Sequence, residues 1–153
     1  MGAALGAAAF VVRVATPPLS PTSTWFSAVL EGLEAVVLLW AGYAAKRRGR
    51  RPPIDGAAVG FLYGLIAGLG DIVNPTTFAD ERRFLLARQA ALRHSILKLS
   101  RSQIVHDARL YTTAAAHWEA VLGSVLYGVL FGLVLGWVGS LFYTPRARGQ
   151  GSP

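Results

Sequence analysis

The sequence contains no cysteine, so the protein has no thiol nucleophile, no disulfide framework and no thiolate metal site. It also lacks a nucleophile elbow and a phosphate-binding loop, and its histidines are too far apart for a paired helical metal motif. The glycines at 68 and 70 begin a dinucleotide fingerprint, but Val73 stands where the third glycine is required. These absences predict that the protein is not an enzyme, and the residues indicate no particular cofactor or metal.

Charge is sparse over long stretches of the chain, and apolar residues fill them. Of 153 residues, 53% are hydrophobic, the mean hydropathy is +0.43, and the apolar residues are concentrated in three blocks, at 25–45, 56–73 and 120–143. Glu31, Glu34 and Asp71 are the only charged residues in these blocks. As helices, the blocks would be about 31, 27 and 36 Å long, which brackets a hydrocarbon core of roughly 30 Å. We therefore predict three membrane spans.

Aromatic residues stand near the ends of these blocks, where amphipathic rings prefer the headgroup level of a bilayer. They are Trp25, Phe26, Trp40, Tyr43, Trp118, Phe142 and Tyr143. Because the chain length fits a single domain, the pattern predicts an all-α polytopic helical membrane protein, with about three transmembrane helices plus a long amphipathic helix. We expect an integral protein of a bacterial or archaeal cell membrane.

Further segments complete the predicted organisation. Residues 1–21 form an apolar N-terminal segment, in which 2–15 is only about 21 Å long as a helix. We expect a short membrane-inserted or partner-packed helix there, with a fourth span as the alternative. A cleaved signal peptide is not expected, because Arg13 follows the apolar run instead of preceding it. The helical membrane domain covers 22–143, and the polar tail at 144–153 is expected to be disordered.

The segment at 77–116 differs from the spans, because its charged and apolar residues alternate at helical spacing. Thr77, followed by Asp80 and Glu81, is typical of a capped helix start. The pattern predicts an amphipathic helix, interrupted near 100–103. It would lie on the membrane surface, or project from it and lead into the third span.

Basic residues outnumber acidic ones, and the formal net charge is +7. Because many of them lie next to apolar spans, we expect contacts with anionic lipid headgroups or a protein partner, and no nucleic acid. The residues concerned are Lys46, Arg47, Arg48, Arg50, Arg51, Arg82, Arg93, Lys98 and Arg101. The density of charge at 46–53 favours that loop as cytoplasmic.

Small residues recur at every fourth position in the second and third blocks. They are Gly56, Gly60, Gly64 and Gly68, and then Ser124, Gly128, Gly132, Gly136 and Ser140. An interior glycine costs a helix about 1 kcal/mol relative to alanine. Close packing offsets this cost in lipid, because small residues let two helix backbones approach each other. The stripes predict tight helix contacts, either within the chain or with another copy or subunit.

Acidic residues inside the predicted spans are the candidates for function. Glu31 and Glu34 lie about 9 and 14 Å into the first span, where a buried acidic residue normally faces a bundle interior or water. In an up-and-down bundle, Asp71, His117 and Glu119 come to the same membrane side as Glu31. Oxygen-rich clusters suit hard cations or protons, so the five residues form a candidate cation or proton site. Alternatively, Glu31 and Glu34 are protonated, or bond to a partner's side chains and fix assembly.

The run LEGLEAVVLLWAGYAAKRR at 30–48 resembles the first motif helix of high-affinity iron permeases. In that family, an Arg-Glu-Gly-Leu-Glu run starts a span that ends in a basic loop. The resemblance implies that Glu31 and Glu34 correspond to the iron-binding carboxylates of the motif. This chain departs from the family at Leu30, which stands in place of the arginine, and it has no second copy of the motif.

Two functions fit the sequence. The first is an accessory or structural subunit of an oligomeric membrane complex, which acts through small-residue helix packing. The second is a minimal cation or proton transporter or channel that oligomerises around Glu31 and Glu34. The partners expected are therefore a bilayer with anionic headgroups, and either further copies of the chain or other membrane subunits.

Overall fold

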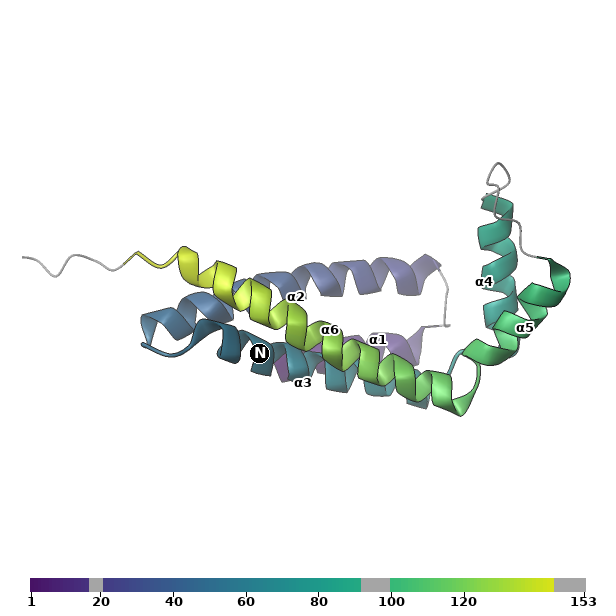
Figure 1. The fold of residues 1–153 in the computed structure, drawn as a ribbon, viewed down its shortest axis with the longest axis horizontal. Helices are drawn as coiled ribbons and strands as arrows, with labels where there is room; N and C mark the ends of the chain where they lie inside the picture. Colours follow the sequence, from purple (N-terminus) through teal and green to yellow (C-terminus); the bar gives the residue numbers. More distant parts are fainter. Residues whose placement is uncertain (17–20, 92–99, 145–153) are drawn as a thin grey trace, which may run out of the picture.

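The computed structural model describes residues 1–16, 21–91 and 100–144 (Figure 1). Within these ranges the chain forms six helices and no strand: α1 Gly2–Ala15, α2 Pro21–Arg47, α3 Pro52–Val73, α4 Phe78–Ala91, α5 Arg101–Tyr111 and α6 Ala114–Leu141. Three helical stretches are long and apolar enough to cross a membrane, at Trp25–Arg47, Pro52–Val73 and Ala114–Leu141. The predicted all-α membrane fold with three transmembrane helices is confirmed. The polar tail from residue 145 lies outside the described residues.

Two helices begin earlier than the sequence predicted. α3 begins at Pro52, because proline fits the first turn of a helix, where its missing amide is not needed. α6 begins at Ala114, because the Thr113 hydroxyl caps it by accepting a 3.1 Å hydrogen bond from the Ala116 amide. Between α2 and α3 the chain turns at Gly49, whose φ of 69° favours glycine. The loop between these spans is therefore shorter than expected.

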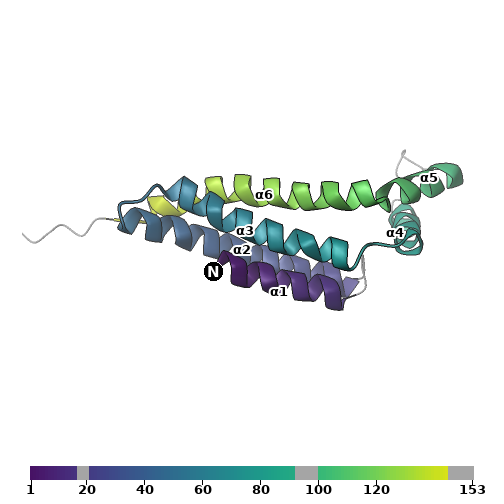
Figure 2. The same ribbon diagram turned by 90° about the horizontal axis from the view of Figure 1, so that it is seen from below.

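α3 is the central helix of the bundle. It packs most extensively against α6, which runs antiparallel to it, and it also contacts α1 and α2. α1 runs parallel to α3, with Gly2 against Val59 and Gly6 against Tyr63. Figure 2 shows α1 on the opposite side of α3 from α6. α1 has 14 residues, against 22 to 28 in the three spans, and it packs alongside them.

The small-residue stripes of α3 and α6 face each other within the chain. A Cβ atom added at Gly60 would overlap the carbonyl oxygen of Gly128, and one added at Gly56 would overlap that of Gly132. The same holds for Gly64, which lies against the backbone of Ser124. Gly68 meets Val121, and the Ser140 hydroxyl donates to the Trp137 carbonyl of its own helix at 2.6 Å. The two helices therefore touch backbone to backbone, as close packing in lipid requires.

α2 meets α6 at one end of the bundle. A Cβ at Gly42 would overlap the backbone of Gly136, and one at Gly139 would overlap the Leu39 carbonyl. From this crossing, α2 and α6 diverge toward α4 and α5 in both views (Figures 1 and 2). The divergence opens the space in which the candidate site lies.

The predicted long amphipathic helix is two helices, α4 and α5, separated by a gap in the described residues at 92–99, which includes Arg93 and Lys98. As predicted, α4 starts at a capped turn, where the Thr77 hydroxyl bonds the Asp80 carboxylate at 2.6 Å. α4 and α5 pack on each other through three buried side chains, Leu85, Ile104 and Ala108. In the described structure, α5 packs lightly on α6, and α4 makes no packing contact with the bundle helices. The hairpin therefore protrudes from the end of the bundle (Figure 1).

Candidate functional site

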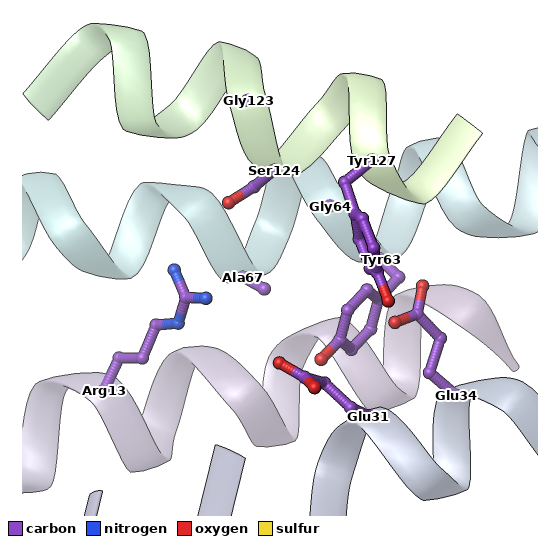
Figure 3. A pocket seen from close by; sticks show the side chains of 9 residues that line it. All are labelled: Arg13, Glu31, Glu34, Tyr63, Gly64, Ala67, Gly123, Ser124 and Tyr127. Carbon is purple, nitrogen blue, oxygen red and sulfur yellow. The ribbon is translucent and has the colours of Figure 1, made fainter. Parts of the chain in front are cut away.

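A cavity of about 270 Å³ lies among the four helices of the bundle, where α2 and α6 have diverged. α1, α2, α3 and α6 each contribute to its wall (Figure 3). The lining residues are Arg13, Glu31, Glu34, Tyr63, Gly64, Ala67, Gly123, Ser124 and Tyr127. The small residues among them leave the space open, and the polar ones supply its chemistry.

Glu34 lies in the wall of the cavity because it belongs to the buried stripe of α2. It lies one turn before Leu38 and two turns before Gly42, at the spacing that keeps residues on one helical face. Its side chain is 1% exposed and that of Leu38 is 0% exposed. Leu38 and the α2–α6 crossing at Gly42 therefore close the space beyond Glu34. Glu31, one turn earlier on α2, lines the cavity but is exposed.

The carboxyl group of Glu34 has no partner in the part of the chain that the structure describes. Both of its oxygen atoms are buried, and neither takes part in a hydrogen bond. A charged group buried without a partner is costly in an apolar interior, and more so in the middle of a membrane span. The bare carboxylate form of Glu34 is therefore unfavourable in this position.

Two tyrosines stand beside the carboxylates. Tyr63 of α3 is 9% exposed, and Tyr127 of α6 lines the same cavity. Both line the cavity with Glu31 and Glu34, and Figure 3 shows the two carboxyl groups turned toward the tyrosine side chains. The site thus combines two carboxylates with two aromatic rings.

Arg13 forms the opposite wall of the cavity (Figure 3). Its guanidinium donates to the Asp71 carboxylate at 2.5 Å, which links α1 to the end of α3. The Asn74 side-chain amide also donates to the carbonyl oxygens of Arg13 and Thr16, at 2.9 and 3.1 Å. The C-terminus of α1 is therefore attached to α3 by three polar contacts, and the Arg13 charge is held away from Glu34.

The structure does not gather the five predicted residues into one group. Glu31 and Glu34 share the cavity, whereas Asp71 is paired with Arg13. Glu119 is exposed on α6. Among the described residues, no group of three or more His, Asp or Glu side chains is placed to hold a metal ion. Asp71 is kept apart from Glu34 because Arg13 of α1 pairs with it. The sequence analysis had not predicted where α1 packs.

Arg13, Tyr63 and Tyr127 are the site residues that sequence analysis missed. Each is a polar or charged side chain in an apolar helix, and that signal was available. Arg13 is the one charge in its segment, and the tyrosines lie inside the second and third blocks. Their importance depends on which helix faces they occupy, and helix packing decides that.

The basic cluster at the turn between α2 and α3 lies at the other end of the bundle from α4 and α5 (Figure 1). All of its charged side chains, from Lys46 to Arg51, are exposed. Arg50 forms a 3.5 Å ion pair with Asp55 in the first turn of α3. At this end Tyr43 of α2 also contacts Tyr143, with ring centroids 5.9 Å apart. Aromatic rings and basic side chains thus meet at one end of the spans, as at a headgroup layer.

Comparisons of the chain with known protein families, with curated proteins and with solved structures found no match. The class of protein therefore follows from the structure: it is a polytopic α-helical membrane protein. Its bundle contains a carboxylate-lined cavity that is open on one side.

Proposed function

We propose that this protein is a minimal cation or proton transporter, which binds a small cation or a proton at Glu34 and Glu31 on its way across the membrane. The observation that carries the proposal is the buried, unpartnered carboxyl group of Glu34 in a cavity between membrane-spanning helices. Intramembrane carboxylates are expensive, and they characteristically mark ion or proton pathways.

The shape of the bundle supports access from one side. Glu31 is exposed and lies nearer the end that carries α4 and α5, whereas Leu38 and the contact between Gly42 and Gly136 close the other end. A cation that enters between α2 and α6 would pass Glu31 before it reaches Glu34. The cavity belongs to one chain, so this binding step does not need a second copy. Oligomerisation around the exposed Glu31 remains compatible with it.

Glu34→Gln is expected to abolish transport while leaving the fold intact, because glutamine keeps the shape of the side chain but cannot carry the charge. The measurement uses the purified protein in liposomes that contain a pH-reporting dye, with proton movement followed after a pH jump or after addition of external cations. Glu119→Gln is the matched control, since Glu119 is exposed on α6 and does not line the cavity. Equal flux through Glu34→Gln and wild-type protein would sink the proposal.

A second candidate function is that of an accessory subunit in a membrane complex. It is favoured by the α4–α5 hairpin, which protrudes and carries exposed apolar side chains outside the spans, among them Phe84, Leu86 and Leu110. The glycine stripes no longer argue for it, because α3 and α6 bury them against each other. The hairpin would then be the docking element.

Replacing residues 78–111 by a flexible linker tests this second function. Native mass spectrometry of the protein, gently extracted from its own membrane, should show unrelated polypeptides at a fixed ratio. The linker variant should lose them while its bundle stays helical by circular dichroism. Deletion of residues 145–153 serves as the control. Recovery of the chain only as a monomer or a homo-oligomer argues against the subunit role.

A further inference from the structure

The geometry points to an organic cation with N–H donors as the occupant of the cavity: a primary ammonium or a guanidinium group on a short apolar stem. This inference rests on the proposed function and narrows its substrate class. Three observations carry it: the size of the cavity, the carboxylates and aromatic rings that line it, and the unpartnered oxygens of Glu34.

The cavity is too large, and too poor in ligands, for a bare metal ion. Its volume of about 270 Å³ compares with roughly 10 to 15 Å³ for a cavity that holds one water molecule. Calcium takes six to eight oxygen ligands, and magnesium demands a tight octahedron. Here the carboxylates are two, and within the described chain no third His, Asp or Glu joins them. A molecule of several non-hydrogen atoms fills such a space better than an ion.

The oxygens of Glu34 need hydrogen-bond donors, and an N–H cation supplies them together with the compensating charge. An ammonium carries three donors and a guanidinium five, and charge-assisted bonds from either to a carboxylate are stronger than neutral ones. A quaternary ammonium would neutralise the charge but leave both oxygens without donors. Glu31 is placed to accept a further bond at the open side of the cavity.

The rest of the wall suits the body of such a molecule. Tyr63 and Tyr127 present aromatic rings, whose faces attract organic cations. Gly64 and Ala67 on α3 form an apolar floor between the tyrosines and Arg13. Arg13 on the far wall is paired with Asp71, so Glu31 and Glu34 are left to meet the ligand.

Isothermal titration calorimetry of the purified protein in lipid nanodiscs tests the inference with three probes: butylammonium, tetramethylammonium and Mg²⁺. Butylammonium should bind, and tetramethylammonium, which has the same charge but no N–H, should bind at least tenfold more weakly. Glu34→Gln should weaken butylammonium binding at least tenfold, and Glu119→Gln should leave it unchanged. Tyr63→Phe should keep most of the affinity, whereas Tyr63→Leu should lose several-fold. Circular dichroism establishes that each variant is folded, and Tyr63→Phe still reports on the site if Tyr63→Leu is not.

The outcomes separate the two proposals. Binding of Mg²⁺ at Glu34 without binding of butylammonium overturns the organic-cation inference and leaves the proposed function standing. The same holds if no probe binds but Glu34→Gln abolishes proton flux in liposomes. If butylammonium and tetramethylammonium bind equally, the N–H requirement is wrong. If no probe binds and flux does not depend on Glu34, both proposals fall.

Discussion

Gly128→Leu is expected to prevent formation of the folded bundle. Even the first side-chain atom at position 128 would overlap the carbonyl oxygen of Gly60, so a leucine can fit only if α3 and α6 separate. Separation would remove the largest helix contact in the structure, and the walls of the cavity with it. Overpacking in a well-packed interior costs about 1 to 3 kcal/mol, and more where backbone must move. Resistance to unfolding by sodium dodecyl sulfate, followed by circular dichroism, measures the effect.

The same helix offers a control with the opposite expected sign. Nothing lies within 4 Å of a Cβ added at Gly123, which is five residues from Gly128. Gly123→Ala should therefore stabilise α6, by up to about 1 kcal/mol from helix propensity. Gly128→Ala, the identical chemical change, should destabilise the protein. Equal effects of the two alanines on the unfolding free energy would show that α3 and α6 do not touch as described.

Asp71→Asn is expected to weaken binding of butylammonium at least tenfold, although Asp71 does not line the cavity. The substitution removes the carboxylate that holds the Arg13 guanidinium. Because Arg13 lines the same cavity as Glu31 and Glu34, the released guanidinium would pair with them and compete with the external cation. Asn74 still bonds the backbone at Arg13 and Thr16, so α1 should stay in place.

A double variant distinguishes competition from damage. In Arg13→Gln/Asp71→Asn the competing guanidinium is absent, so butylammonium affinity should return to the wild-type value or exceed it. The readout is again calorimetric titration in nanodiscs, with helix content checked by circular dichroism. If the double variant binds as weakly as Asp71→Asn alone, the loss comes from a distorted α1 and not from Arg13.

The fold could be predicted from the sequence because its main features are local. Span length follows from block length, and the four-residue repeat of Gly56 to Gly68 indicates a surface for close packing whatever its partner is. The choice of that partner could not be predicted, because a second copy offers α3 the same stripe that α6 does. The extent of α6 was underestimated because its first turn, from Ala114, depends on a cap at Thr113 that lies outside the apolar block.

The site could be predicted only in part. Glu34 was identified because a carboxylate in mid-span is costly wherever it lies. Its separation from Asp71 could not be predicted, because it depends on Arg13, and α1 is too short for its sequence to show what it packs against. The tyrosines were missed for a related reason: a tyrosine in an apolar helix can face lipid or a cavity, and only the packing distinguishes these.

The contact between α3 and α6 also determines which parts of the molecule can move. The backbones of α3 and α6 touch, so no layer of side chains between them can rearrange. We therefore expect these two helices to move as one rigid unit. α2 touches the backbone of α6 at Gly42 and Gly139, and the two helices diverge from this crossing. Along α2, Glu34 lies on one side of this crossing, and the basic turn after Arg47 lies on the other side. If α2 tilts about this crossing when the cavity is filled, the basic turn at the opposite membrane face is expected to shift with it.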